Sequence, residues 1–282
     1  MNVVYLIGTV LAVVFTIFGI IVSISINPGQ SPMFTFGFAP DKLWNFFDLS
    51  SILIVVGGTL AVVIACYPKQ AKAIPRHIGI MLRAKAFNPA VYVDELVELA
   101  QIARRNGLLA LEERAANQQD PFFKQAIMLI VDANDPDRVR SILENDIEQT
   151  SARHQEVVAM YERGSNAAPA FGMIGTLIGL INMLKGLSGA DMDALGPNMS
   201  VALITTFYGS FLAHVIFNPI AANLTARDEE EVLCRQIVVE GIMAIQSGEN
   251  PKFLRERLLT FVNQKQRDKQ ADQTTQSNEN AA

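Results

Sequence analysis

Asp, Glu, Lys and Arg are missing from four long stretches of this 282-residue chain: 1–40, 50–67, 166–184 and 201–224. A helix needs about 20 mostly apolar residues to cross the ~30 Å hydrocarbon core of a bilayer. Only 18% of the residues are charged and 50% are hydrophobic, a balance typical of membrane proteins rather than soluble ones. The absences therefore predict four membrane spans.

Cysteine is also scarce, because the chain has only Cys66 and Cys234. Two distant cysteines provide neither a disulfide framework nor the roughly four ligands of a zinc or iron–sulfur site. His77 and His154 have no Cys, His or carboxylate at metal-ligand spacing, and the glycine-rich run at 172–179 lies inside an apolar stretch rather than after a strand. We expect no enzyme activity, no cofactor, no metal and no nucleic-acid partner.

The N-terminal part predicts two spans joined by an outer loop. Val3 to Ile26 is apolar, has no basic residues before it and is longer than the core of a signal peptide, so we expect it to be retained. Asn27 to Phe47 is rich in Pro, Gly and Phe, includes Trp44 and predicts a loop with interfacial aromatics. The second span is expected from Ser50 to Tyr67.

Positive charges without acids follow this second span. No Asp or Glu lies between Pro68 and Val93, where the basic residues are Lys69, Lys72, Arg76, Arg83 and Lys85. Basic residues next to a span mark its cytoplasmic side. The N-terminus is then also cytoplasmic, and the loop at 27–47 faces outward.

The segment from Val91 to Ala167 is charged and has a helical period of about 3.6 residues. Asn106 and Gly107 are expected to end its first helix, and a short helix at Leu108–Asn117 to follow. Two Asp-Pro pairs predict further helix starts, since each combines an N-cap with proline at the first helical position: Asp120 with Pro121 and Asp135 with Pro136. The last helix is expected to continue into the third span, with Gly164 and Pro169 as places for a bend.

The third span, Asn166 to Lys185, carries glycines at helical spacings, namely Gly172, Gly175 and Gly179. Small residues four apart let another helix approach closely, so this span is expected to pack in a bundle. Thr176 and Asn182 add polar groups at membrane depth, which suggests a protein partner or a pore. After a short loop, Leu187 to Asn198, the fourth span at 201–224 contains Thr205, Thr206, Ser210, His214, Asn218 and Pro219.

The sequence thus predicts an all-α membrane protein, with four transmembrane helices and a helical cytoplasmic domain between the second and third. The predicted parts are residues 1–67 (spans 1 and 2), 68–165 (cytoplasmic domain), 166–226 (spans 3 and 4), 227–263 (C-terminal helices, at Glu229–Ser247 and Pro251–Val262) and 264–282 (disordered tail).

No span has a carboxylate in its middle, although a group that carries a proton or strips water from a cation inside a membrane usually needs one. If ions pass, a second subunit must supply the acid. Thr176, Thr205 and Thr206 are either pore-lining groups or hydroxyls bonded to the preceding helical turn. His214 is either a proton relay or, as we favour, a neutral histidine bonded to a neighbouring helix.

Several motifs, in order, resemble the flagellar stator A-subunits of the MotA/PomA family over nearly the whole chain. They are DLSSILIVVGGT (48–59), ARRNGLLALEE (103–113), PAFGMIGTLIGLI (169–181), GPNM (196–199), ALITTFYG (202–209), NPIA (218–221) and GIMAIQSGENP (241–251). The loop at 27–47 is longer than in the shortest members, which limits what the resemblance implies about the outer rim.

The resemblance implies a pentameric ring of A-subunits in the bacterial inner membrane, with cytoplasmic termini. The ring would surround two single-span MotB/PomB-type subunits that carry the ion-binding aspartate, and would push on the rotor protein FliG. The resemblance implies that four charged residues contact the rotor, namely Arg104, Arg105, Glu112 and Glu113. The alternative is that they are ordinary solvated charges on helix surfaces. The resemblance also implies that Pro169 and Pro219 couple conformational changes; the alternative is that these prolines simply end helices. It implies that Asp48 lies at the outer mouth of the ion path; the alternative is that Asp48 is only the N-cap of the second span.

Two other functions compete with this interpretation. An energiser of the ExbB/TolQ type also pairs with a carboxylate-bearing partner, but the paired N-terminal spans and the segment from Arg104 to Glu113 argue against it. A solute transporter predicts an internal repeat with broken helices, and the two halves of the chain have no such repeat. The ion is sodium or a proton. Because Thr176, Thr205 and Thr206 resemble the hydroxyls of sodium-type members, they favour sodium.

Overall fold

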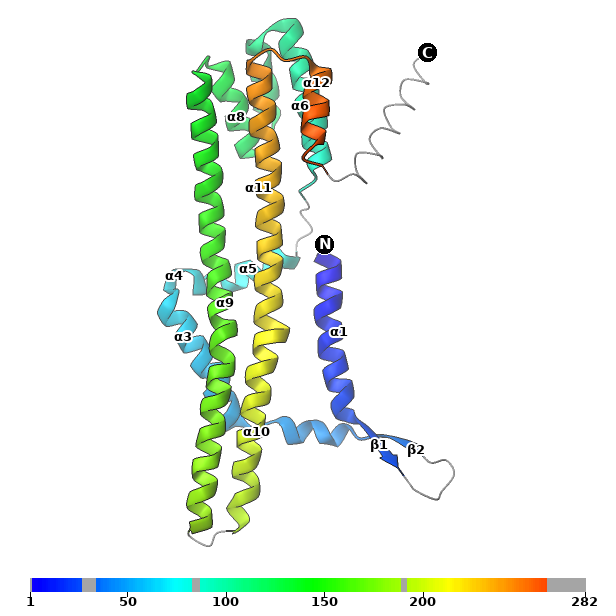
Figure 1. Cartoon of the computed structure of the whole chain (residues 1–282), viewed down its shortest axis with the longest axis vertical. Coiled ribbons are helices and arrows are strands. Elements are labelled where there is room, and N and C mark those ends of the chain that lie inside the picture. The colour runs from blue at the N-terminus through cyan, green and yellow to red at the C-terminus, as the bar shows by residue number, and fades with distance from the viewer. Residues whose placement is uncertain (1, 27–33, 83–86, 189–191, 263–282) are drawn as a thin grey trace. The chain divides into compact units, whose positions relative to one another are not determined.

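The computed structural model describes residues 2–26, 34–82, 87–188 and 192–262, and nearly all of them are helical (Figure 1). The chain forms two compact units. Unit 1 comprises residues 1–84 and 155–225, and unit 2 comprises residues 85–154 and 226–282. Helices α9 and α11 each contribute one part to each unit.

Unit 1 begins with helix α1 (Asn2–Ile21), which is followed by strands β1 (Val22–Ile26) and β2 (Phe34–Phe38). The strands pair antiparallel, with Val22 opposite Phe38 and Ile26 opposite Phe34. The expectation that the first span is helical up to Ile26 is therefore wrong at its end. The sequence VSISI alternates β-branched and small polar residues, a period of two that suits a strand. This hairpin is the exception to the predicted all-α class, which is otherwise confirmed.

The second apolar helix runs from Leu49 to Cys66 and has three parts. A 3₁₀ helix (Pro40–Phe46) precedes it, and it consists of α2 (Leu49–Ile52), a π-helical segment (Leu53–Gly57) and α3 (Gly58–Cys66). The short helices α4 (Pro68–Ala71) and α5 (Ile74–Leu82) follow. Three helices in the described residues are long and apolar enough to span a membrane, and Ile7–Ile21 of α1 is a shorter apolar helix.

The remaining spans belong to two long helical runs. Helix α9 (Pro136–Ser188) has 53 residues, so the prediction of one continuous helix from Pro136 into the third span is confirmed. After a 3₁₀ turn (Met192–Ala194), the fourth span consists of α10 (Leu195–Phe211), a π-helical segment (Leu212–Phe217) and the start of α11 (Asn218–Gln246). The separate helix expected at Glu229–Ser247 is instead the end of α11, because no helix-breaking residue separates it from the fourth span.

Unit 2 contains α6 (Pro89–Asn106), a 3₁₀ turn (Leu108–Leu111), α7 (Glu112–Asn117), α8 (Pro121–Val131), α12 (Pro251–Leu259) and parts of α9 and α11. The two predicted N-caps are confirmed. Asp120 accepts a hydrogen bond from the amide of Phe122 at 3.0 Å, and Asp135 accepts one from the amide of Asp137 at 3.0 Å. The helix expected at Leu108–Asn117 is present, but its first turn is 3₁₀.

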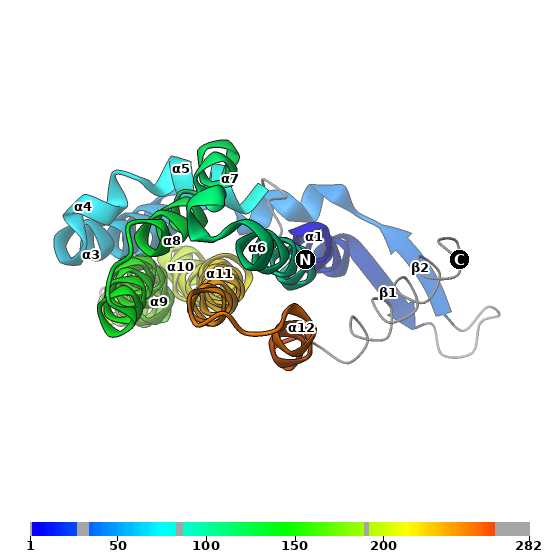
Figure 2. The ribbon, with the colours of Figure 1, turned by 90° about the horizontal axis from the view of Figure 1, so that it is seen from above.

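The core of unit 2 is apolar and draws on all its helices, with Leu96, Phe123, Leu143, Ile242 and Leu254 fully buried. Within this unit α6 lies next to α12, and the parts of α9 and α11 run side by side (Figures 1 and 2). Arg255 of α12 pairs with Asp94 of α6, and Arg140 of α9 pairs with Glu240 of α11 at 2.8 Å. These contacts give a helical unit with one core.

The division into units differs from the predicted cytoplasmic domain at 68–165. Residues 68–84 and 155–165 belong to unit 1, where Gln70 donates to Glu156 at 2.8 Å. The assignment of parts to membrane and cytoplasm stays a prediction. Some predictions lie outside the described residues: Arg83, Lys85, the part of the outer loop at 27–33 and the disordered tail at 264–282.

Candidate functional sites

Helices α9 and α10 approach closely along a row of glycines. A Cβ atom added at Gly175 would lie 2.4 Å from Cγ2 of Thr205, and one at Gly179 would lie 2.6 Å from the carbonyl oxygen of Asn198. On α10, a Cβ atom at Gly209 would lie 2.7 Å from the carbonyl oxygen of Ala168. The prediction that the glycines of the third span admit another helix is confirmed, and the partner is the fourth span of the same chain.

This close approach joins the hydroxyls of Thr176 and Thr206. Their Oγ1 atoms lie 2.6 Å apart, and the Thr176 hydroxyl is also 3.0 Å from the carbonyl oxygen of Ala202. Thr206 donates toward the same carbonyl at 3.3 Å. Each hydroxyl has one proton to donate and two lone pairs that can accept hydrogen bonds. The contact between the two hydroxyls uses at most one of their four lone pairs. Thr206 is exposed, so oxygen lone pairs of the two hydroxyls are available to a ligand.

Thr205, the third threonine predicted for the ion path, has surroundings that differ from those of Thr176 and Thr206. Its side chain is fully buried, packs against Gly175 and donates to the carbonyl oxygen of Val201 at 2.9 Å. The structure therefore places Thr205 in the contact between α9 and α10 rather than beside Thr176 and Thr206. The three threonines are alike in residue type and depth along the sequence, so the sequence alone does not distinguish a packing hydroxyl from an accessible one.

Asp48 caps the second apolar helix. Its carboxylate accepts hydrogen bonds from the amide of Ser51 at 2.7 Å and from the Ser51 hydroxyl at 2.5 Å. A carboxylate at a helix N-terminus is stabilised by the unpaired amides there and by the helix dipole. The capping role, one of the two interpretations, is thus present. It leaves open the second interpretation, in which Asp48 attracts cations.

The two prolines to which the resemblance assigns conformational coupling both lie inside helices. Pro169 lies inside α9 opposite Gly209, and Pro219 is the second residue of α11, two positions after the π-helical segment at Leu212–Phe217 ends. Proline lacks an amide donor, so it frees a carbonyl in the preceding turn, and π-helical turns occur at such interruptions. The hydroxyl of Ser165 on α9 donates to the carbonyl oxygen of Ala213 in this segment at 3.4 Å. Neither proline ends its helix: Pro169 lies inside the continuous α9, and Pro219 lies near the start of α11, just after the π-helical segment.

The Phe217 ring from the same segment fills the space beside Gly164. A Cβ atom at Gly164 would lie 2.7 Å from the ring. His214 is exposed, and its Nδ1 lies 3.2 Å from the side-chain amide of Asn218 on the next turn. The expected partner on a neighbouring helix is therefore wrong for the contact seen here, because Asn218 lies four residues further along the same helical run. Ser165 and Phe217 carry no local sequence signal for these contacts, because their partners are about 50 residues away in the chain.

The four predicted rotor-contact residues lie around the turn between α6 and α7. Arg104 and Arg105 end α6, Gly107 follows with a φ of 82°, and Glu112 and Glu113 begin α7. All four charged side chains are exposed. A φ in the left-handed region favours glycine, and here it reverses the chain so that both charged pairs lie near one turn.

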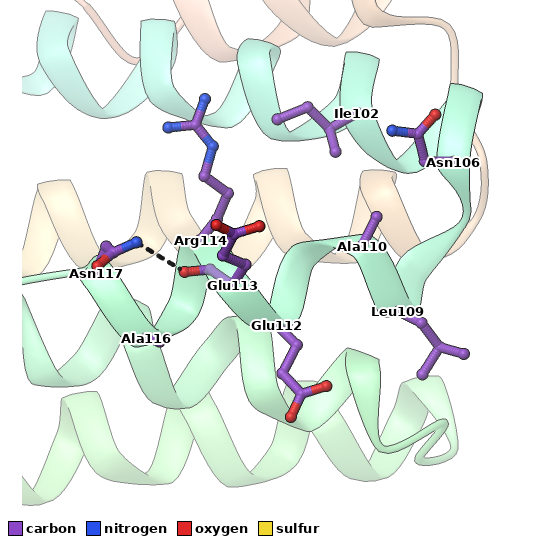
Figure 3. Close-up of a pocket in the computed structure, with 9 residues that line it drawn as sticks. All are labelled: Ile102, Asn106, Leu109, Ala110, Glu112, Glu113, Arg114, Ala116 and Asn117. Carbon is purple, nitrogen blue, oxygen red and sulfur yellow. Dashed lines mark hydrogen bonds between the residues drawn. The ribbon is translucent and has the colours of Figure 1, made fainter.

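A groove of about 790 Å³ opens beside this turn (Figure 3). Glu112 and Leu109 point away from Ile102 and Asn106 in this view, and the Leu109 side chain is 73% exposed. Arg114, two residues after Glu112, is instead paired with Glu98 of α6. The turn therefore presents both signs of charge around an exposed leucine, an arrangement that can meet complementary charges on a protein partner.

The structure also pairs groups that are distant in sequence. Asp228 of α11 lies 2.7 Å from Nδ1 of His154 and accepts from Ser151 at 2.6 Å. Tyr92 donates to Asp120 at 2.8 Å, and burial together with this hydrogen bond raises the pKa of Tyr92. His77 is buried beside Tyr161, with 3.4 Å between Nδ1 and the hydroxyl. Among the described residues no group of three His, Cys, Asp or Glu could hold a metal ion.

The chain is similar to several known proteins. Residues 114–237 match the model of the MotA/TolQ/ExbB proton channel family. The chain is 39% identical over 236 residues to Motility protein A of Borreliella burgdorferi, covering 83% of this chain and 90% of that protein. It is 39% identical over 229 residues to Chemotaxis protein PomA of Vibrio alginolyticus, covering 81% of this chain and 89% of that protein.

A solved structure has the same fold. The flagellar MotAB stator complex from Bacillus subtilis contains a chain that superposes with a TM-score of 0.80 at 29% identity, covering 94% of this chain and 98% of that chain. Three helices of the described residues are long and apolar enough to span a membrane, and Ile7–Ile21 is a shorter apolar helix; together with the likeness to a stator complex they show that the chain is a multi-pass membrane protein. The relatives match nearly their whole length, and the chain therefore belongs to the MotA/PomA family of flagellar stator A-subunits.

Proposed function

We propose that this chain works with a single-span subunit of the MotB/PomB type, whose aspartate binds the permeating ion, and that the complex turns ion flow into torque. The observation that carries the proposal is the hydroxyl pair of Thr176 and Thr206 on helices without a carboxylate at that depth. Hydroxyl oxygens can replace part of a cation's water shell but do not supply its charge. A partner carboxylate would complete the site.

Thr176 and Thr206 would line the ion path, since the Thr206 side of their pair is exposed and lone pairs remain unused. Thr205 would act on the path indirectly, because its methyl and hydroxyl groups separate α9 from α10 at Gly175. Asp48 would attract cations at the outer mouth while it caps its helix. We propose sodium as the ion, because paired hydroxyls suit a hard cation.

The same proposal covers assembly and orientation. Five copies would surround two B-subunits in the inner membrane, with both termini of each copy in the cytoplasm. The basic residues Lys69, Lys72 and Arg76 after the second apolar helix support this orientation by the positive-inside rule. The turn from Arg104 to Glu113 would contact FliG, and Pro169 and Pro219 would couple changes in the ion path to that turn.

Ion flux and motility test the proposal together. Reconstituted alone, the chain should conduct neither sodium nor protons, and co-reconstitution with a B-subunit should restore flux. The pair of subunits should also restore swimming to a cell that lacks its own stator. Flux from the A-subunit by itself would contradict the need for a partner carboxylate. Flux by the pair without restored swimming would favour the ExbB/TolQ type of energiser, which the family model also includes.

Swimming speed measured at fixed pH and membrane potential distinguishes the ions. A unit charge crossing 100 mV yields ~2.3 kcal/mol whichever ion carries it, so energy alone does not discriminate. Speed should fall as external sodium is replaced by potassium. Unchanged speed would mean that protons drive the motor and that the threonine pair lines or packs a proton path.

A further inference from the structure

Helices α4 and α5 follow the second apolar helix almost without a break. Helix α3 ends at Cys66, α4 begins at Pro68, and α5 begins at Ile74. Tyr67, with a φ of −132° and a ψ of 61°, separates α3 from α4. From there the amides of Ala71 and His77 donate to the carbonyl oxygens of Tyr67 and Ala73, so the backbone stays close to helical from α4 into α5. A short helical segment therefore starts within two residues of the end of a membrane span.

One face of this segment is docked on α9. Gln70 donates to Glu156 at 2.8 Å, and the buried His77 meets the Tyr161 hydroxyl at 3.4 Å. Ala71 and Ile74 pack against the apolar cluster that includes Tyr161. These contacts hold the segment in one rotational position about its own axis.

The other face is basic. Lys69 lies in α4, Lys72 in the turn after it and Arg76 in α5. Because Lys72 has right-handed helical angles, the spacing of three and four residues still puts the three side chains on about the same side of the segment. All three side chains are exposed, and within the part of the chain that the structure describes none of them forms an ion pair. The sequence has no acid between Pro68 and Val93 to neutralise them. The docked contacts thus hold three uncompensated positive charges together at the end of a span.

We propose that this basic face, Lys69, Lys72 and Arg76, binds the phosphate groups of anionic phospholipids at the cytoplasmic surface of the membrane. The inference rests on the orientation given under Proposed function. Each basic residue at an anionic leaflet contributes to attraction within a Debye length of the surface. Lys69 lies three residues after the end of α3, and α5 runs across α9 rather than along it (Figure 1), so the segment does not lead Arg76 directly away from the end of the span. The position of the charges favours lipid over an acidic protein as the partner. An acidic protein could bind basic residues anywhere on the cytoplasmic surface, whereas lipid headgroups lie only near the ends of the spans.

Lipid selectivity of the full chain, assembled with its B-subunit, tests the proposal. The complex is reconstituted in phosphatidylcholine bilayers that contain spin-labelled phosphatidylglycerol or spin-labelled phosphatidylcholine, and electron paramagnetic resonance gives the relative association constant. The test variant carries Lys69→Gln, Lys72→Gln and Arg76→Gln. The matched control carries Lys124→Gln, Arg138→Gln and Lys252→Gln, which removes three exposed positive charges from unit 2.

The unchanged complex should prefer phosphatidylglycerol, and added salt should weaken this preference because exposed charges are screened. In the test variant the relative association constant for phosphatidylglycerol should fall by at least about fivefold, which is roughly the effect of one basic residue at an anionic surface. The control should keep it. Equal preference in the test variant and the unchanged complex would overturn the proposal. So would a variant that keeps its lipid preference but loses its oligomeric mass, since the basic face would then contact another subunit.

Orientation is measured separately, by labelling Lys69→Cys with a membrane-impermeant maleimide in a background where Cys66 and Cys234 are serine. Labelling from outside intact spheroplasts would overturn the orientation under Proposed function and the lipid proposal with it. Labelling only from the cytoplasmic side, combined with no preference for phosphatidylglycerol, would overturn the lipid proposal and leave the orientation intact.

Discussion

The Oγ1 atoms of Thr176 on α9 and Thr206 on α10 lie 2.6 Å apart. This distance depends on the glycines that let the two helices approach, because a Cβ atom at Gly175 would collide with Thr205 one residue before Thr206. The hydroxyl pair and the glycine packing are therefore one structural unit, and changes in the packing should reach the hydroxyls.

Gly175→Ala should destabilise the α9–α10 contact. The added Cβ atom would lie 2.4 to 2.6 Å from three side-chain atoms of Thr205, so the helices must separate. Overpacking of this kind costs about 1–3 kcal/mol. Thermal unfolding in detergent should occur at a lower temperature, whereas Gly19→Ala, where a Cβ atom meets nothing within 4 Å, should leave the temperature unchanged or raise it. Equal unfolding temperatures for the Gly175 and Gly19 variants would mean that the contact is not tight.

Thr176→Val and Thr206→Val should each lower ion flux, and their effects should not add. Each change keeps the side-chain shape but removes a hydroxyl that the other side chain contacts. Coupling of about 0.5–2 kcal/mol is expected from polar contacts in membranes. A double-mutant cycle on sodium flux by the A–B complex measures it. Thr16→Val, which removes a hydroxyl bonded only to its own helix at Ala12, is the control. Strictly additive losses would show that the two hydroxyls act separately.

Reversal of Arg104 and Arg105 to Glu should impair swimming without reducing membrane insertion or ring assembly. Both side chains are exposed beside the acidic start of α7, so the reversal changes the sign of a surface charge but removes no core contact. Because exposed ion pairs contribute only about 0–1 kcal/mol each, single changes should be mild. Swimming speed and the mass of the purified complex are the measurements, with Lys124→Glu and Arg138→Glu as the control pair. Normal swimming after all four rotor charges are neutralised would refute the rotor contact.

Stability should fall in acid partly because of His77. Burial, and secondarily the charge of Arg76, lower the pKa of His77 below the ordinary histidine value of 6.5. Between the folded and unfolded pKa values the unfolded chain binds the extra proton, so the free energy of unfolding rises with pH in that window and levels off above 6.5. Unfolding followed from about pH 5 to about pH 7.5 should therefore give a steeper pH dependence for the natural chain than for His77→Gln. Parallel curves for the two proteins would exclude this role.

The apolar helices and capped helix starts were predictable because they depend on local sequence. A charge-free run must leave water, and an Asp-Pro pair can cap a helix from its own side chain, as Asp120 does. The end of α1 was not predicted, because the apolar run continues to Ile26 and hydrophobicity alone does not distinguish the last turn of a helix from a strand.

The sequence by itself determined the residue types of the candidate sites, while only the tertiary structure decided which residues meet. Glycine spacing on α9 predicted a close partner but did not identify it, since any helix with small residues satisfies that pattern. The fold brings α10 there, buries Thr205 and leaves Thr206 beside Thr176. Neighbouring threonines on one helix differ by about 100° in direction, so a single inter-helix contact separates a packing group from a candidate ion ligand.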